Sequence, residues 1–238
     1  NRMARRKRCF WPWILVVSVG ITLMLYPSIT QYLSRQRAVK MVEQYQVQST
    51  LESNVSSATG DESLQEAQEF NRLLATRGKL EILSPEMTQQ YLKLLNPMGD
   101  GMMGTLHIPS LDVALPIYHT VDDLVMQHAI GHMPETSLPI GGKSTHAVLA
   151  GHSGLANDRL LTDLPRMTLG QEFSVTLLGR TLKYQVDKIQ TVLPDALDQL
   201  AIIPGEDYVT LLICVPYGIN SHRLLVRGRR ILSDAEKE

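Results

Sequence analysis

The chain has 238 residues, of which 44% are hydrophobic and 20% charged, with a formal net charge of −1. All 24 acidic residues lie after residue 34, against 18 basic residues, so this part of the chain has a net charge of −6. An acidic surface of this kind excludes nucleic acid as the expected partner. The roughly 200 residues involved are enough for one domain with a sizeable core and some additional structure.

The N-terminus predicts a membrane span. Residues 9–34 contain no charged side chain, and the apolar run 10–29 is long enough to cross a bilayer. The residues before it are largely basic: Arg2, Arg5, Arg6, Lys7 and Arg8. Such a cluster favours an N-terminus in the cytoplasm. We therefore expect a cytoplasmic tail over 1–8, a single-pass cell-membrane anchor over 9–33 and an extracellular remainder, with a cleavable signal peptide as the alternative.

Residues 34–95 have the composition of a polar, helical juxtamembrane segment. The stretch 63–66 has the S-x-x-E form of a capping box and predicts the start of an amphipathic helix that ends at Gly78. A second helix is predicted after Ser84, because a serine N-cap is followed by Pro85 in the first helical position.

Residues 96–232 consist of short apolar runs separated by glycine and proline, which is typical of a barrel or sandwich of short strands. The expected strands are 105–108, 113–118, 145–150, 172–178, 181–192, 208–215 and 223–232. A hairpin turn is predicted at Gly179-Arg180, between the fourth and fifth runs. Short helical turns are expected within 120–128 and 159–164, and 233–238 form a polar tail.

The two cysteines, Cys9 and Cys214, are separated by the predicted span and cannot pair with each other. A lone extracellular thiol is either paired with another chain, reactive, or a buried spectator. Cys214 ends a β-rich run that starts at Tyr208, and Pro216 and Gly218 then interrupt the strand. We therefore expect the thiol at an exposed strand end. A cysteine nucleophile there needs an imidazole or a positive charge beside it.

His152 is the favoured partner among the seven histidines, because it also follows an apolar strand and precedes Ser153-Gly154. His222, eight residues from the cysteine, is the alternative, and either histidine can instead be a surface or core residue. Arg223 begins the next run, and an antiparallel return of the chain brings its guanidinium near the thiol. There it can bind a substrate carbonyl or an oxyanion, unless it belongs to a solvated basic edge.

A metal site is not expected at the remaining histidines. His128 and His132 are four residues apart, but Gly131 and Pro134 break the helix they would need, and no H-E-x-x-H acid lies between them. The sequence also has no glycine-rich phosphate loop, so we expect neither a metal nor a cofactor.

The stretches LAGHSG around His152 and TLLICVPYGINSHRLLVRG around Cys214 resemble the sortases, surface transpeptidases of Gram-positive bacteria, and in particular the pilin-polymerising class C. The stretches MGTLHIPS, LPIYH and TSLPIGGKSTHAVLAGH are similar to that class as well, so the resemblance covers roughly 96–232. The family motif is often T-L-x-T-C, which Thr210 and Leu211 match, while Ile213 replaces its second threonine.

This resemblance implies a mainly β fold, an eight-stranded and largely antiparallel barrel with short helices. It also implies that Cys214 is the nucleophile, His152 the acid and base, and Arg223 the third catalytic residue. The implied reaction cleaves an LPXTG-like sorting signal between Thr and Gly through a Cys214 thioester. The acceptor implied by class C is a lysine amine of another pilin subunit, so pilins are the expected partners.

Two features depart from class C. Its members commonly carry a lid with an Asp-Pro-aromatic motif before the barrel, whereas the nearest stretch here, 84–86, is a helix start. Many also have a second, C-terminal span, whereas this sequence ends in the polar stretch SDAEKE, so we expect anchorage by the N-terminal span alone. Two alternatives stay open: a sortase that anchors surface proteins to a cell-wall precursor, and a non-catalytic, membrane-tethered pilin-binding protein. A papain-like hydrolase is disfavoured, because its cysteine precedes its histidine and opens a helix.

Overall fold

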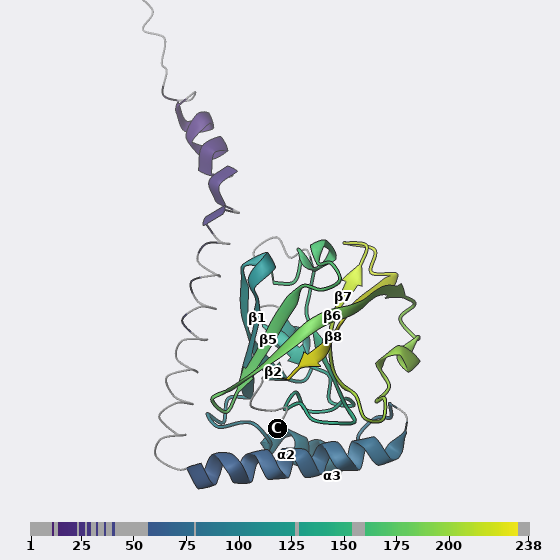
Figure 1. Ribbon diagram of the computed structural model, residues 1–238. Helices are drawn as coiled ribbons and strands as arrows, with labels where there is room; N and C mark the ends of the chain where they lie inside the picture. The colour runs from purple at the N-terminus through teal and green to yellow at the C-terminus, as the bar shows by residue number, and fades with distance from the viewer. Residues whose placement is uncertain are drawn as a thin grey trace, which may run out of the picture.

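The computed structural model describes residues 57–78, 80–126, 129–153 and 160–232, together with parts of a helical stretch between residues 11 and 40. The strands form a closed barrel, and two helices lie beneath it (Figure 1). The eight strands are β1 (Met102–Ile108), β2 (Val113–His119), β3 (Ile130–His132), β4 (Thr145–Ala150), β5 (Glu172–Leu177), β6 (Arg180–Val192), β7 (Asp207–Val215) and β8 (His222–Ile231).

The strand order around the barrel is β1-β2-β3-β4-β7-β8-β6-β5, and β5 returns to β1 to close it. The β2–β3 and β4–β7 pairs are parallel, and the other neighbouring pairs are antiparallel. The predicted fold, mainly β with a largely antiparallel eight-stranded barrel, is confirmed. The order also sets β4, β7 and β8 side by side, although β4 is far from the other two in sequence.

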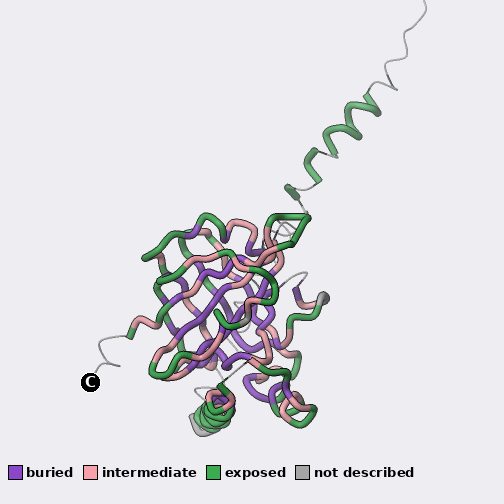
Figure 2. The backbone as a smooth tube through the Cα atoms, turned by 90° about the vertical axis from the view of Figure 1, so that its right-hand side faces the viewer, coloured by how far each residue is buried: buried purple, intermediate pink, exposed green. Residues whose placement is uncertain are grey.

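The core fills the barrel interior because side chains alternate along each strand. In β7, Val209, Leu211 and Ile213 all belong to the large inner cluster. Buried positions accordingly recur along the strands in Figure 2. A smaller apolar cluster of Val148, Leu200 and Leu225 lies on the outer face.

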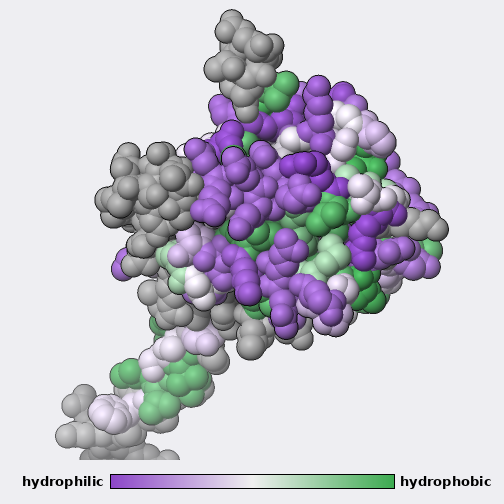
Figure 3. Space-filling view, turned by 90° about the horizontal axis from the view of Figure 1, so that it is seen from below, coloured by the Kyte–Doolittle hydropathy of each residue, from purple (hydrophilic) through white to green (hydrophobic). Residues whose placement is uncertain are grey.

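The helices α2 (Ser57–Arg77) and α3 (Pro85–Lys93) lie beneath the barrel (Figure 1). α2 is joined to the loop before β4 by Asn71, whose side-chain amide donates to the carbonyl of Leu138 at 3.0 Å and accepts from its N–H at 2.7 Å. The face seen from below, which carries α2, is largely hydrophilic with small hydrophobic patches (Figure 3). α3 is joined to the barrel by the hydroxyl of Tyr91, which lies 2.9 Å from Nδ1 of His132, so both helices belong to the folded domain.

The helix predictions differ from the structure mainly in their ends. Ser84 caps α3 as predicted and accepts from the N–H of Met87 at 3.3 Å. The predicted start of α2 at residue 63 was wrong, since the helix already begins at Ser57. A capping box shows where a helix can start, but nothing in the preceding six residues stops the helix from extending.

The remaining elements follow the predicted runs with small shifts. The β5–β6 hairpin forms, but its turn is Leu178-Gly179, where both residues have positive φ. β3 was missed because it has three residues, too few for a sequence pattern. Short helices lie at α4 (Asp123–Met126), η1 (Pro109–Leu111), η2 (Leu164–Arg166) and η3 (Leu197–Leu200), of which η1 and η3 were not predicted.

The predicted span over 9–33 falls partly outside the described residues, and the predicted tails 1–8 and 233–238 do so entirely. No helix in the described part of the chain combines the length and the apolar character needed to cross a membrane.

Candidate functional site

Two of the predicted catalytic residues, Cys214 and Arg223, lie on the neighbouring strands β7 and β8, and the third, His152, lies two residues after the end of β4. β4 and β7 run parallel with Ala150 opposite Leu212, and the N–H of Gly151 continues this pairing by donating to the carbonyl of Leu212 at 3.0 Å. His152 therefore follows at the level of Cys214. On the other side of β7, Cys214 is paired with Arg223 of β8. The barrel brings together residues that are up to 71 positions apart.

The same alternation sets the side chains of these residues on one face. Ile213 and Leu224, the sequence neighbours of Cys214 and Arg223, belong to the inner core. Because side chains alternate along a strand, Cys214 and Arg223 point to the outer face. Leu149 of β4 faces inward as well, so continuing the alternation past the end of the strand at Ala150 directs His152 to the outer face. All three residues are partly exposed, and the thiol of Cys214 is free.

Hydrogen bonds hold the backbone around these residues. The hydroxyl of Ser153 donates to the carbonyl of Cys214 at 2.7 Å, so the chain beyond β4 is tied to the end of β7. Arg223 donates from Nη1 to the carbonyls of Asn220 at 2.9 Å and His222 at 3.2 Å. The guanidinium is thus tethered to the β7–β8 loop at the edge of the site, where a fixed cation can stabilise a developing negative charge.

Gly151 is required by close packing just before His152. A Cβ atom at this position would lie 2.9 Å from the Cδ1 atoms of both Ile130 and Leu161, which are buried. Glycine therefore lets the end of β4 approach the core closely enough to hold His152 level with Cys214.

The alternative histidine, His222, lies on the other face of the sheet. It pairs with Val215 at the end of β7 and shares the alternation of Leu224, which faces inward, and its Nδ1 is 2.9 Å from the hydroxyl of Ser221. His132, half of the rejected metal pair, is buried and contacts Tyr91 and the carbonyl of Ser137. His128 lies outside the described residues.

An apolar pocket of about 210 Å³ is lined by Arg223 and by Ala150 and Leu212, which lie two residues before His152 and Cys214. Its floor is formed by the barrel residues Ala150, Leu212 and Leu225, with Arg223 at its edge. Most of the other lining residues come from the β6–β7 loop (Leu193, Pro194, Ala196 and Leu200), from the segment between β2 and β3 (Val121 and Met126) and from Met133 just after β3. The pocket suits an apolar side chain of an extended peptide, and Arg223 is the one charged residue among the described residues that line it.

Sequence reasoning missed this pocket and the contact from Ser153. The sequence did contain information that could have located the floor of the pocket. Leu212 lies two residues before Cys214, and Leu225 two residues after Arg223, so each shares a face of its strand with a predicted site residue. The sequence contained no such information about the wall formed by the loop, since the position of a loop over a sheet follows from tertiary contacts. The described residues contain no group of three or more histidine, cysteine or acidic side chains that could hold a metal ion.

The sortase domain family matches residues 106–231 of this sequence, which include all three residues. The chain belongs to the sortase family. Among curated proteins it is 24% identical over 116 residues to sortase A of Streptococcus agalactiae serotype III (strain NEM316), covering 48% of this chain. It is also 26% identical over 136 residues to sortase A of Bacillus anthracis, covering 57% of this chain. The matches span 47% and 63% of those relatives' lengths.

Solved structures of class C sortases are more similar to this sortase. Sortase C1 of Streptococcus agalactiae is 39% identical, with a TM-score of 0.77 over 82% of this chain and 100% of that chain. Sortase C of Streptococcus pneumoniae is 37% identical, with a TM-score of 0.72 over 82% and 97%. Sortase C-1 of Actinomyces oris is 40% identical, with a TM-score of 0.67 over 74% and 99%. The predicted class C resemblance is confirmed.

Proposed function

We propose that this sortase is a membrane-anchored cysteine transpeptidase of pilus assembly. It cleaves an LPXTG-like sorting signal between Thr and Gly and joins the threonine to a lysine amine of another pilin subunit. The observation that supports this most is the register of three strands. β4 pairs with β7 up to Ala150 and Leu212, two residues before His152 and Cys214, and Cys214 pairs with Arg223 of β8, which lines an apolar pocket.

Acylation uses all three residues. The Cys214 thiolate attacks the carbonyl carbon of the signal's threonine, forming a C–S bond and a tetrahedral oxyanion. The Arg223 guanidinium hydrogen-bonds this oxygen, and its permanent charge favours the transition state over the ground state. As the oxyanion collapses, the C–N bond to glycine breaks, and the His152 imidazolium gives a proton to the departing amine. The product is a thioester on Cys214.

Deacylation reverses the proton path. A lysine amine attacks the thioester carbonyl while neutral His152 accepts a proton from it. The C–S bond then breaks, the Cys214 thiolate is regenerated, and an isopeptide bond joins the two substrates. Because neither step changes an oxidation state or requires a Lewis acid, the three side chains suffice for the chemistry.

The class of the structural relatives supports pilin as substrate over a cell-wall precursor. The structural relatives from Streptococcus agalactiae, Streptococcus pneumoniae and Actinomyces oris, at 36–40% identity, are sortases C, although a sortase A of Corynebacterium diphtheriae is also 38% identical. The structure of the Streptococcus pneumoniae sortase C is described in terms of its pilin substrate specificity. The two activities differ in the amine accepted. Incubation with a pilin that bears its sorting signal should therefore produce a ladder of covalent multimers on a denaturing gel, and a soluble cell-wall amine alone should not replace the pilin.

Membrane anchorage is part of the proposal and is supported by the sequence 9–34, which carries no charge after a basic cluster. The apolar side chains described in this stretch, among them Ile14, Val16 and Ile29, are exposed, which suits contact with lipid. Fractionation of cells that express the full chain tests this point: the protein should resist alkaline extraction from membranes, and deletion of residues 10–29 should release it.

The test of the reaction is hydrolysis of a fluorogenic LPXTG peptide by wild type and by Cys214→Ala, His152→Ala and Arg223→Ala. Only the wild type should turn over the peptide at an appreciable rate. A matched control is Arg229→Ala, because Arg229 is exposed and pairs with Glu206 away from the pocket. If the wild type binds the peptide without cleaving it, the transpeptidase proposal is wrong and the protein is a binding protein. If Cys214→Ala cleaves the peptide as well as the wild type does, Cys214 is not the nucleophile.

A further inference from the structure

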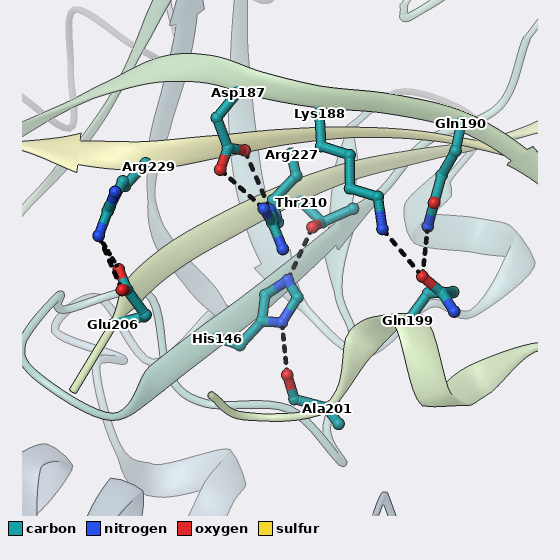
Figure 4. Close-up of polar contacts among 10 residues, drawn as sticks. All are labelled: His146, Asp187, Lys188, Gln190, Gln199, Ala201, Glu206, Thr210, Arg227 and Arg229. Atoms are coloured by element: carbon teal, nitrogen blue, oxygen red, sulfur yellow. Dashed lines mark hydrogen bonds and ion pairs between the residues drawn. The ribbon is translucent and has the colours of Figure 1, made fainter. Parts of the chain in front are cut away.

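His146 of β4 is a buried histidine that the proposed chemistry does not use. It is 1% exposed, although it lies on the outer face of the barrel, because the β6–β7 loop covers it. Its Nδ1 lies 3.0 Å from the carbonyl oxygen of Ala201, and its Nε2 lies 2.7 Å from the hydroxyl of Thr210 (Figure 4).

The two contacts determine the tautomer of this ring. A carbonyl oxygen only accepts, so Nδ1 carries the hydrogen and donates it to Ala201. Nε2 of the neutral ring then accepts from the Thr210 hydroxyl. Burial lowers the pKa of His146 to about 4, with the charge of Arg227 as a smaller cause in the same direction, while Asp187 and the hydrogen bond to Ala201 act the other way. The ring is therefore neutral at physiological pH.

The loop above His146 is held at three consecutive residues. The side-chain oxygen of Gln199 accepts from Lys188 at 3.1 Å and from Gln190 at 3.0 Å, both on β6 (Figure 4). Leu200 is 2% exposed and packs in the outer apolar cluster with Val148 and Leu225. The carbonyl oxygen of Ala201 accepts the hydrogen bond from Nδ1 of His146. At these three residues the hydrogen bond from β4 comes from His146, while the N–H of Thr145 donates to the carbonyl of Glu206 at 3.1 Å at the other end of the loop.

The same loop forms one wall of the pocket beside Cys214. Leu193, Pro194, Ala196 and Leu200 line it from the loop, opposite Leu212 and Leu225 of the barrel. Thr210, Leu212 and Cys214 share one face of β7 at spacings of two residues, so His146 lies at the far end of the face whose other end carries the thiol. A shift of the Ala201 carbonyl would move Leu200 and so change the width of the pocket.

We infer that His146 is a positioning residue for substrate recognition. Its hydrogen bond to Ala201 holds the β6–β7 loop at a distance from the barrel that lets the pocket between them fit an apolar side chain of the sorting signal. This inference rests on the proposed function, since it assigns the pocket to that peptide. His146 does not touch the reacting atoms. Its loss should weaken binding of the peptide and leave the chemical step intact.

A matched pair of variants separates the two contacts of the ring. The amide nitrogen of His146→Asn takes roughly the place of Nδ1 and keeps a donor for Ala201. His146→Gln reaches the place of Nε2 and keeps a partner for Thr210, but loses the donor to Ala201. Both replacements are polar, uncharged and buried, so a general loss of stability should affect both variants.

The measurements are kcat and KM for fluorogenic peptides with Leu-Pro-Glu-Thr-Gly and Ala-Pro-Glu-Thr-Gly cores, and hydrogen exchange of residues 193–206. His146→Gln should raise KM for the leucine peptide about fivefold to tenfold, the effect of one lost hydrogen bond, with kcat within about twofold. Its preference for leucine over alanine should shrink, and its loop amides should exchange faster. His146→Asn should keep values near those of the wild type.

The inference is overturned if the two variants have the same KM and the same loop exchange, or if His146→Gln lowers kcat without changing KM. Failure of the proposed function gives a different result: the wild type itself then shows no Cys214-dependent turnover. In that case equal loop exchange in both variants still rejects the role of His146, whereas faster exchange in His146→Gln alone retains its role in holding the loop.

Discussion

At the scale of single residues, the site depends on two strand pairings, that of β7 with β8 and that of β4 with β7. Cys214 and Arg223 are opposite each other across β7 and β8, so the turn between them fixes their relation locally. His152 is different, because its position depends on the parallel pairing of β4 with β7, which continues through Gly151. A lysine at position 223 and an added methyl group at position 151 therefore test different parts of the arrangement.

The first prediction concerns the planar guanidinium of Arg223. Arg223→Lys keeps the charge but loses the fork of donors and the bonds to the carbonyls of Asn220 and His222. We expect kcat/KM for an LPXTG peptide to fall about 100-fold to 1000-fold, the usual cost of removing one oxyanion donor. Steady-state kinetics measures this, with Arg229→Lys as control. A decrease of less than threefold would assign Arg223 to the solvated edge of the barrel.

The second prediction concerns Gly151. Gly151→Ala adds a methyl group 2.9 Å from side-chain atoms of Ile130 and Leu161, so the core or the end of β4 has to move. We expect a loss of about 1–3 kcal/mol in the free energy of unfolding and a larger loss of activity, since His152 follows directly. Urea denaturation and peptide hydrolysis measure the two effects.

Gly60→Ala in α2 is the matched control for this change, because a Cβ there meets nothing within 4 Å. Alanine inside a helix should stabilise the protein by up to about 1 kcal/mol without changing activity. If Gly151→Ala retains both the stability and the activity of the wild type, close packing does not position His152.

At the scale of elements, the sequence predicted what depends on local pattern. The long strands, the serine cap of α3 and the β5–β6 hairpin follow from alternation, capping and turn residues, and all three appear in the structure. The short β3 could not be predicted, since it is a strand only because β2 and β4 flank it. For the same reason the candidate residues could be proposed singly, but their alignment depends on the pairing of β4 with β7.

The third prediction concerns the attachment of α3 to the barrel. The hydroxyl of Tyr91 accepts from the N–H of Thr120 at 3.2 Å and donates to Nδ1 of His132 at 2.9 Å, while Nε2 of His132 donates to the carbonyl of Ser137. Tyr91→Phe leaves a part-buried N–H and a buried ring nitrogen without this partner. The expected cost is about 1–3 kcal/mol.

Urea denaturation measures this cost, and Tyr217→Phe is the control because Tyr217 is 69% exposed. The control should differ from the wild type by less than about 0.5 kcal/mol. Equal midpoints for the two variants would mean that α3 is held by apolar packing alone.

At the scale of the whole molecule, the barrel keeps two neutral histidines away from water. Burial lowers the pKa of His132 and of His146 to about 4 each, with hydrogen bonds to backbone carbonyls as opposing causes. Both rings join elements that are distant in sequence: His132 links α3 to the barrel, and His146 links β4 to the β6–β7 loop. Protonation of either ring should therefore be coupled to the stability of the whole fold.

The fourth prediction is a loss of stability in mild acid. The unfolded chain binds protons at these histidines near pH 6.5, whereas the folded chain binds them only near pH 4, so the stability present above pH 6.5 decreases as the pH falls towards 4. Each histidine contributes up to about 3 kcal/mol to this decrease. Asp207 acts in the opposite direction near the lower end of the window, because burial raises its pKa.

Urea denaturation at a series of pH values from 7 to 4.5 measures this decrease. His146→Asn, which has no titrating group at this position, should make the decrease shallower. A stability that is independent of pH over this range would contradict the assignment of both rings as buried and neutral.

The central claim is that the thiol of Cys214 becomes acylated because β4 and β8 bring an imidazole and a guanidinium to either side of it. The most direct measurement is mass spectrometry of the protein after incubation with an LPXTG peptide. We predict an added mass equal to the peptide up to its threonine, located on the fragment that contains Cys214, removed by hydroxylamine, and much reduced in His152→Ala and Arg223→Ala. An adduct of the same amount in Cys214→Ala, or no adduct in a wild type that binds the peptide, would contradict the account.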